Sequence, residues 1–303
     1  MQRIKHLVLG ITGGIAAYKA AELTRLLVKN GVSVQVVMTD AAGHFITPVT
    51  MQALSGRAVH SKMWDASIPN GMPHIELSRE ADVILVAPAS ADFMAKLANG
   101  QADDLLSTLC LARDCQLVIA PAMNKQMWEN AATQKNIQLL KNQGIGILGP
   151  TNGSQACGEN GMGRMLEAKE IFEGVVAFFQ PKVLAGKKVL ITAGPTYEAI
   201  DPVRGITNKS SGKMGFAIAQ AALEAGAEVK LIAGPCHLET PLAFTGQINR
   251  INVTSAQEMS DIVMQDLNVD VFFAVAAVAD WSIDNVSTQK IKKDHSSNTG
   301  MTP

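Results

Sequence analysis

The segment APAMNKQMWEN (residues 120–130) follows directly on a strand-like apolar run and combines an amide with bulky apolar side chains. Pro121 should end the strand, so the residues after it belong to a loop at the strand's C-terminal end. The loop gathers three large apolar side chains around one carboxamide, namely Met123, Met127 and Trp128 around Asn124. Such a group is more typical of a pocket wall than of a turn that faces water. We therefore expect a pocket that holds a small molecule here.

Two adjacent glycines, Gly13 and Gly14, lie between a strand-like run and a helical pattern in LGITGGIAAYKAAEL (residues 9–23). Their spacing is not GxGxxG, so the dinucleotide-binding fingerprint is not met. Free N–H groups and the helix dipole would nonetheless favour an anion above this turn. A tight turn with no ligand is the alternative.

Two further residues, His74 and Cys157, could move a proton. Histidine is the side chain whose charge changes near neutral pH, although a surface or hydrogen-bonded histidine without a catalytic role is the alternative. Cys157 lies in SQACGENGMGRM (residues 154–165), with three glycines within eight residues of it. That composition is typical of a lid, and a glycine-rich turn with an inert thiol is the alternative.

Short apolar runs alternate with helical patterns through residues 1–181, from HLVLGI to QLVIAPAM and beyond. Strands without polar alternation predict a parallel sheet covered on both faces, which is the α/β class with a doubly wound, Rossmann-like or flavodoxin-like sheet. Ligands of such sheets bind at the C-terminal ends of the strands. The strings TGG, MTD, APAS and APAMN fall at those ends, and a helix is expected over residues 124–144.

A second α/β unit is expected from residue 187, after a boundary at 181–187 where Pro, Lys and Gly gather. Its pattern predicts about three strands, with helices over 214–227 and 256–267. The chain ends in the polar stretch IKKDHSSNTGMTP, so this second doubly wound domain (187–303) is expected to be incomplete.

The composition restricts the possible partners. The chain has 303 residues, 47% of them hydrophobic, and a formal net charge of −1, which is long enough for two domains with separate cores. Near-zero charge gives no reason to expect nucleic acid or an anionic membrane, and no apolar run approaches the roughly 20 residues of a membrane span. The N-terminal apolar run is too short for a signal peptide, and the four cysteines form no CxxC pair. We expect a cytoplasmic protein.

Motifs of the first half together resemble those of the homo-oligomeric flavin-containing Cys decarboxylases: TGGIAAYK, PAMNKQMW and ACGENGMGRM, with His74 in the string HIEL. The resemblance implies an FMN-dependent decarboxylase domain over residues 1–181, in which Asn124 binds the substrate carboxylate, His74 is the catalytic histidine and Cys157 donates a proton. It further implies a list of contacts: Gly13 and Gly14 for the FMN phosphate, Thr39 and Ser90 for the flavin, and Met127 for the substrate pocket. Asp92 stands where many relatives have Asn.

The implied chemistry is a decarboxylation assisted by oxidation and reduction. A cysteine amide has no electron sink for the carbanion that CO₂ loss leaves behind, so a cofactor must supply one. Oxidation of the cysteinyl side chain by FMN gives a thioaldehyde, whose C=S group accepts these electrons and becomes an enethiolate. Return of the hydride, with a proton from Cys157, gives the saturated thiol. A relative that lacks the cysteine would stop at the enethiol.

In the second half, residues 191–219 predict a strand, a Gly/Ser/Lys turn and a helix, which form a plausible phosphate cradle. The Walker A pattern is not matched, because Met214 follows Lys213. Four strings together resemble those of the phosphopantothenate–cysteine ligases: DPVR (201–204), NKSSGKMG (208–215), AAVAD (276–280) and KIKK (290–293). Alone, KIKK would be interpreted as a solvated basic stretch.

This second resemblance implies a ligase domain over residues 187–303 that uses CTP and Mg²⁺. Asn208 would polarise an acyl-cytidylate intermediate, Ala276 and Asp280 would line the nucleotide site, and Lys290 would meet the CTP phosphates. Ligases of this family continue well beyond the position that corresponds to residue 303, so the ligase half is expected to be truncated and inactive as it stands.

The order of the two halves resembles the bifunctional enzymes of coenzyme A biosynthesis. These join cysteine to 4'-phosphopantothenate and decarboxylate the product, 4'-phosphopantothenoylcysteine, to 4'-phosphopantetheine. The family builds its decarboxylase site between subunits of a trimer, so His74 is expected to serve a neighbour's flavin, and complete ligase domains pair as dimers. The alternatives are a prenyl-FMN synthase-like flavoprotein and a non-enzymatic, flavin-binding regulatory protein.

Overall fold

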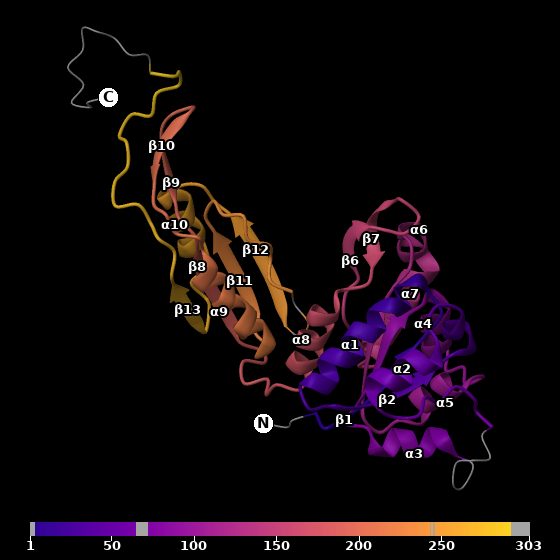
Figure 1. The fold of residues 1–303 in the computed structure, drawn as a ribbon. Coiled ribbons are helices and arrows are strands. Elements are labelled where there is room, and N and C mark those ends of the chain that lie inside the picture. The colour runs from indigo at the N-terminus through magenta and orange to yellow at the C-terminus, as the bar shows by residue number, and fades with distance from the viewer. Residues whose placement is uncertain (1–3, 65–71, 243, 245, 292–303) are drawn as a thin grey trace. The chain divides into compact units, whose positions relative to one another are not determined.

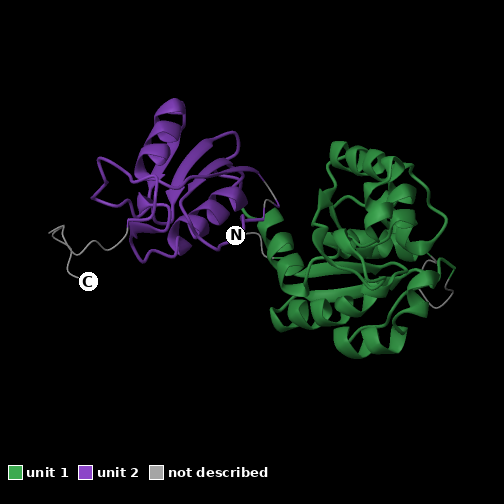
Figure 2. Cartoon of the chain, turned by 90° about the horizontal axis from the view of Figure 1, so that it is seen from above, with its two compact units in different colours: residues 1–180 green, residues 181–303 purple. Residues whose placement is uncertain are grey.

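The computed structural model describes residues 4–64, 72–242, 244 and 246–291, and the chain divides into two compact units, residues 1–180 and 181–303 (Figure 2). Figure 1 labels most of the helices and strands. The strands of the first unit are β1 (His6–Ile11), β2 (Ser33–Met38), β3 (Val83–Ala89), β4 (Gln116–Pro121), β5 (Gly146–Ile147), β6 (Thr151–Ser154) and β7 (Asn160–Arg164). Its helices are η1 (Ile15–Ala17), α1 (Tyr18–Lys29), η2 (Asp40–His44), α2 (Pro48–Ser55), α3 (Pro73–Glu80), α4 (Ala91–Ala98), α5 (Leu105–Ala112), α6 (Lys125–Glu129), α7 (Ala131–Asn142) and α8 (Ala168–Phe178).

The second unit has fewer elements. They are β8 (Lys188–Ala193), β9 (Tyr197–Asp201), β10 (Arg204–Thr207), α9 (Lys213–Glu224), β11 (Glu228–Ala233), β12 (Gln247–Asn252), α10 (Ala256–Gln265) and β13 (Val271–Ala274). Among the described residues, no helix combines the length and the apolar character that crossing a membrane requires.

The first unit is built on a parallel sheet with the strand order β2-β1-β3-β4-β5. Every residue of β3 is buried, and β1, β2 and β4 leave only their first residue outside the buried class. Unbroken apolar strands are what a parallel sheet with two covered faces requires. The predicted α/β class is therefore confirmed. The strand order is the flavodoxin-like one, and the switch point, where the direction of the strand order reverses, lies between β1 and β3.

Helices cover both faces of this sheet. The helices α3, α4, α5 and α7 share one apolar cluster with strand residues such as Val8 and Ile84. Leu7 and Leu9, which point to the other face, are just as deeply buried but lie outside that cluster. The helices α1 and α8 contact each other on this second side (Figure 1).

The helix expected over residues 124–144 is in fact two helices, α6 and α7. Asn130 lies between them in extended backbone, and its side chain accepts a hydrogen bond from the Ala132 backbone N–H at 2.9 Å. Asn is strongly preferred at N-caps, so a new helix begins there. The short α6 thus stands as a separate element at the end of β4.

The second unit contains a parallel sheet with the order β12-β11-β8-β13 and a separate antiparallel pair, β9 and β10. The sequence pattern predicts three of the sheet strands and misses β12, whose sequence QINRIN is partly exposed along an edge. The hairpin of β9 and β10 was also not predicted. In this order the switch point lies between β8 and β13.

Candidate active site

Thr12, the residue after β1, fixes the switch point of the first sheet. Its buried hydroxyl donates to the Pro88 carbonyl at 2.7 Å and accepts from the Ser90 backbone N–H at 3.0 Å. The ends of β1 and β3 are therefore held against each other. This contact places Gly13 and Gly14 close to Ser90, whose side chain caps α4.

A cavity of about 420 Å³ opens at this switch point. Its volume lies in the usual range of small-molecule sites. Seven of the residues expected from the sequence line it: Gly13, Gly14, Ser90, Met123, Asn124, Met127 and Cys157. The parallel sheet and the loops at its carboxyl edge thus gather the three decarboxylase-like motifs into one place.

Asn124 is the N-cap of α6 and is held in one orientation. Its Oδ1 accepts from the Met127 backbone N–H at 2.9 Å, and its Nδ2 donates to Gln126 Oε1 at 2.9 Å. An amide nitrogen carries two protons, of which Gln126 uses one. Because Oδ1 is engaged by the helix end, Asn124 offers the cavity a donor, which suits an anionic ligand.

The apolar wall differs in part from the one expected. Met123 and Met127 line the cavity, whereas Trp128 does not. The half-buried indole packs instead against the apolar cluster of the first unit, beside α7. A large aromatic ring loses more free energy by facing water than a methionine does, so the core takes the tryptophan.

Cys157 belongs to the segment 151–164, in which β6 and β7 form an antiparallel hairpin, called the flap below. The flap lies beside α6 (Figure 1). Met123 N–H donates to the Gly163 carbonyl at 3.0 Å. Gly163 has a φ of +129°, and a Cβ there would overlap the Met123 carbonyl oxygen, so only glycine permits this approach. The Cys157 side chain is exposed between the two strands.

Lys19 connects α1 to the segment after the flap. Its Nζ donates to the Met165 carbonyl at 2.9 Å and to Glu167 Oε1 at 2.8 Å, although the residue is only 6% exposed. The hydrogen bond from Lys19 lowers the pKa of the Glu167 carboxyl, and Arg164 adds to the effect. The helix α1 and the segment after the flap are therefore linked by a buried cation.

A second cavity, of about 630 Å³, adjoins the first and shares Gly13, Ser90 and Met127 with it. Thr39, a predicted flavin contact, lines this second cavity and not the first. Its hydroxyl caps η2 by accepting from the Ala42 backbone N–H at 3.3 Å. All the predicted flavin contacts of the first unit therefore line one or both of these cavities, at the carboxyl edge of the sheet.

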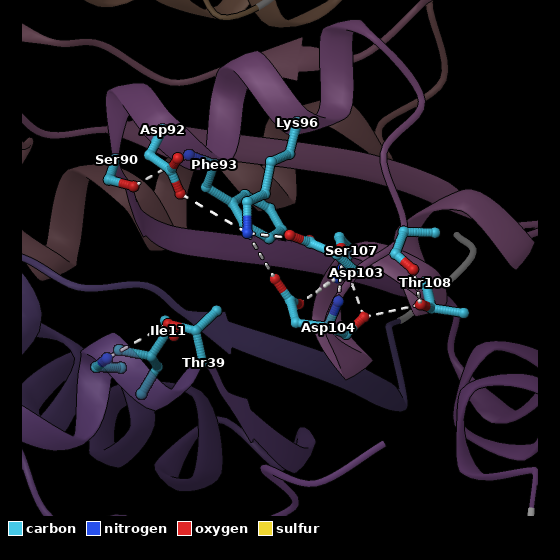
Figure 3. A network of polar contacts seen from close by, with 12 residues as sticks. Ile11, Thr39, Ser90, Asp92, Phe93, Lys96, Asp103, Asp104, Ser107 and Thr108 are labelled. Atoms are coloured by element: carbon cyan, nitrogen blue, oxygen red, sulfur yellow. Dashed lines mark hydrogen bonds and ion pairs between the residues drawn. The ribbon is translucent and has the colours of Figure 1, made fainter. Parts of the chain in front are cut away.

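Lys96 and acidic residues form one wall of the second cavity (Figure 3). Lys96 Nζ lies 3.0 Å from Asp103 Oδ1, 3.4 Å from Asp104 Oδ2 and 3.9 Å from Asp92 Oδ2. The hydrogen bond to Asp103 raises the pKa of Lys96. The network fixes α4, whose N-cap is Ser90, to the start of α5.

His74 lines neither cavity. It lies in the first turn of α3, a helix that packs against α5, and its Nδ1 is buried with no hydrogen-bond partner among the described residues. A single chain therefore does not bring His74 into the cavity that holds Asn124 and Cys157.

In the second unit, Asn208 lies at the switch point between β8 and β13. Its Nδ2 donates to the Ala277 carbonyl, and its Oδ1 accepts from the Ser210 backbone N–H at 3.1 Å. Pro195 and Ala277 form an isolated parallel bridge that extends the β8–β13 pairing to this point. Asn208 thus lies against Ala277, so the strings NKSSGKMG and AAVAD meet at this switch point.

The strings DPVR and KIKK also meet. Asp201 Oδ2 accepts from the Arg204 Nε at 2.9 Å and from the Ile291 backbone N–H at 3.1 Å. The Arg204 guanidinium holds the pKa of this buried carboxyl well below its usual range. Lys290, next to Ile291, is exposed to solvent, as is Asp280.

Some residues of the site were not expected individually from the sequence. Thr12 and Lys19 belong to TGGIAAYK, Glu159 to ACGENGMGRM and Asp201 to DPVR, so each lies in a recognised string that gave no hint of its contacts. Lys96 had no signal beyond its closeness to Ser90.

Two family models match the chain. The Flavoprotein model covers residues 1–180, and the model of the DNA/pantothenate metabolism flavoprotein C-terminal domain covers residues 184–302. The coenzyme A biosynthesis bifunctional protein CoaBC of Vibrio parahaemolyticus is 54% identical over 290 residues, which is 95% of this chain and 72% of that protein. The protein of the same name from Escherichia coli K12 is 48% identical over 291 residues, with 95% and 71% covered. The chain belongs to the family of coenzyme A biosynthesis bifunctional proteins.

Solved structures also resemble part of the chain. A PPC decarboxylase Cys-to-Ser mutant complexed with pantothenoylaminoethenethiol superposes with a TM-score of 0.53 and 32% identity, covering 58% of this chain and 99% of that one. The FMN-binding protein AtHal3 gives a TM-score of 0.51 and 32% identity, covering 58% and 97%. The family resemblance found in the motifs is confirmed, and the prenyl-FMN synthase-like and regulatory alternatives are not favoured.

The residues of the first cavity fit the phosphate of a flavin. A Cβ built on Gly14 meets no atom within 4 Å, so the backbone there faces open space. A Cβ on Gly13 would lie 2.6 Å from the Ala41 Cβ, which shows that the turn packs tightly on its other side. Gly14 caps η1 without a side-chain hydrogen bond, so the helix start has room for an anion.

Proposed function

We propose that the first unit is an FMN-dependent decarboxylase that converts 4'-phosphopantothenoylcysteine into 4'-phosphopantetheine. The observation that carries the proposal is that Asn124 and Cys157 line one cavity with Gly13 and Gly14. The names of the bifunctional relatives and of the PPC decarboxylase structure support it. When bound, the flavin supplies a two-electron sink that takes a hydride from the cysteinyl carbon and returns it after CO₂ has left.

Asn124 binds the substrate carboxylate in this scheme. Its free amide proton gives a hydrogen bond to the carboxylate without a full positive charge, so the ground state is not over-stabilised. Met123 and Met127 make the adjoining wall apolar, and a carboxylate that has lost its water leaves more easily as CO₂. The α6 cap engages Oδ1, so the amide nitrogen is the group that we expect to meet the carboxylate.

Cys157 supplies the proton that completes the saturated product. Its thiol is exposed within the flap and lines the cavity, so it can reach a substrate held by Asn124. The other cysteines are poorer candidates: burial raises the pKa of the Cys110 thiol and also that of Cys115.

We also propose that copies of the chain assemble as trimers, in which His74 of one copy serves the cavity of the next. His74 lines neither cavity of the described chain, so a site that uses it would have to be completed by a neighbouring copy, which supports this. Measurement of the native mass tests the assembly. A protein that turns over as a monomer would contradict it.

The variant Asn124→Asp tests the carboxylate site. Aspartate is as good an N-cap as asparagine, so α6 should keep its start. The like charge should nonetheless repel the substrate carboxylate and reduce CO₂ release about a hundredfold. Asn136→Asp, on α7 and away from the cavity, is the matched control. Equal activity in the two variants would refute the role of Asn124, provided that both retain FMN.

For the second unit we propose CTP-dependent ligation of cysteine to 4'-phosphopantothenate, with Mg²⁺ on the phosphates. The meeting of Asn208 with the AAVAD segment at a switch point supports a nucleotide site there. Because this half is expected to be inactive as it stands, the measurement is nucleotide binding rather than turnover. Equilibrium dialysis with CTP and Mg²⁺ should show binding that Asn208→Ala weakens, and equal binding by the two proteins would contradict the assignment.

A further inference from the structure

Glu159, in the flap, connects the thiol of Cys157 to the amide of Asn124. Its Oε2 accepts from Cys157 Sγ at 3.7 Å, and its Oε1 accepts from Gln126 Nε2 at 2.9 Å. Gln126 Oε1 in turn accepts from Asn124 Nδ2 at 2.9 Å. The Glu159 carboxylate therefore contacts the thiol of Cys157 directly and the amide of Asn124 through Gln126.

Attachment of the flap does not depend on this carboxylate. The Lys125 backbone N–H donates to Gln155 Oε1 at 3.0 Å, and Met123 N–H donates to the Gly163 carbonyl at 3.0 Å. The Gln155 N–H donates to the Glu159 carbonyl at 2.8 Å, a main-chain contact that a substitution of the side chain would leave in place. Glu159 thus contributes something that these bonds do not.

That contribution is a negative charge next to the thiol. Among the described residues, no lysine, arginine or histidine forms an ion pair with Glu159, and Lys125, on the facing helix, pairs with Glu129 at 3.8 Å. A carboxylate in hydrogen-bonding distance of a thiol accepts a hydrogen bond from its S–H group, and it repels a negative charge on the same sulfur.

We propose that Glu159 accepts a hydrogen bond from the Cys157 thiol and so positions its proton for the reaction, a role that rests on the proposed decarboxylase function. In the last stage, the S–H bond of Cys157 breaks, a C–H bond forms at the carbon that lost CO₂, and the electron pair of the S–H bond remains on sulfur. The electron pair of the substrate's C=C bond makes the new C–H bond, and the regenerated C=S group accepts the hydride held by the reduced flavin. Glu159 then transfers a proton from water to the Cys157 thiolate.

The test compares Glu159→Gln with wild type and with Glu129→Gln, which removes one charge from α6 without touching the thiol. The first readout is alkylation of Cys157 by iodoacetamide in flavin-free protein, located by peptide mass mapping. Cys157 is the exposed one of the four cysteines. Loss of the neighbouring charge should make it react roughly five- to tenfold faster in Glu159→Gln, with no change in Glu129→Gln.

The second readout is the product formed with FMN and 4'-phosphopantothenoylcysteine. Glu159→Gln should still release CO₂ but give a larger share of enethiol relative to saturated thiol, and Glu159→Asp, which keeps the carboxylate, should restore part of the wild-type ratio. An unchanged alkylation rate and an unchanged product ratio would overturn the proposal. A wild-type protein that releases no CO₂ would instead refute the decarboxylase function, while the alkylation result would still report on the Glu159–Cys157 contact.

Discussion

Replacing the buried Lys19 by methionine should destabilise the first unit and release the segment after the flap. Methionine fills nearly the same space, so the change removes two charge-assisted hydrogen bonds and little packing. Each such bond contributes about 1.5–3 kcal/mol when it is buried. The Glu167 side chain is 51% exposed, so water replaces Lys19 as its partner in the variant. Most of the free energy of the Lys19–Glu167 hydrogen bond is therefore not lost. The bond to the Met165 carbonyl is not replaced, which leaves a loss of about 2 kcal/mol.

For a unit of 180 residues, this loss corresponds to a fall in the melting temperature of about 4–8 °C. Lys29→Met, at the exposed end of the same helix, should change the free energy of unfolding by less than about 0.5 kcal/mol. Thermal unfolding followed by circular dichroism measures both. Equal melting temperatures for the two variants would refute the assigned role of Lys19.

The pH dependence gives a second check on the same contact. Lys19 lowers the pKa of Glu167 in the folded protein, so the ionised carboxylate stabilises the fold above the unfolded value of about 4.3. This contribution is lost as the pH falls through the lowered folded value. In Lys19→Met, the decline of stability below about pH 4 should therefore be shallower than in wild type.

Three substitutions test other parts of the account. Gly14→Ala should fold normally but fill the open space of the anion cradle, so the affinity for FMN should fall at least about tenfold in a fluorescence titration. Gly13→Ala should instead lower the melting temperature by several degrees, since its Cβ would lie 2.6 Å from that of Ala41; equal stability of the two glycine variants would contradict the geometry. Asp201→Asn should lower the melting temperature of the second unit at neutral pH and make its loss of stability below about pH 4 shallower, because Arg204 depresses the pKa of Asp201 and the stabilisation exists only while the carboxylate is ionised. A wild-type-like acid profile in that variant would show that the pair contributes nothing.

The strands that carry the site could be predicted because a strand buried on both faces is an uninterrupted run of apolar residues. VILVAPA in β3 is apolar throughout, which indicates a buried parallel strand. QINRIN in β12 carries polar residues because it lies at an edge, and the same rule misses it. The break at Asn130 was missed because helical periodicity continues across it, while the cap that starts the second helix depends on one side chain.

The cavity was predictable for a related reason. Gly14, Ser90 and Asn124 follow the ends of parallel strands, and those ends share one edge of a sheet. The contacts of Lys19 could not be foreseen, because its partners lie far away in the sequence. Those of Glu159 could not be foreseen because it lies on the flap, whose strand pairing has no periodic pattern in the sequence. The place of Thr39 in the adjoining cavity depends on where the β2 end lies in space, which spacing alone does not give.

The most direct test of the central claim follows CO₂ from 4'-phosphopantothenoylcysteine labelled in its cysteine carboxyl group. Protein loaded with FMN should release the label as CO₂ and form 4'-phosphopantetheine, whereas Cys157→Ser should release the label but stop at the enethiol. Protein that demonstrably holds FMN and yet releases no label would contradict the account.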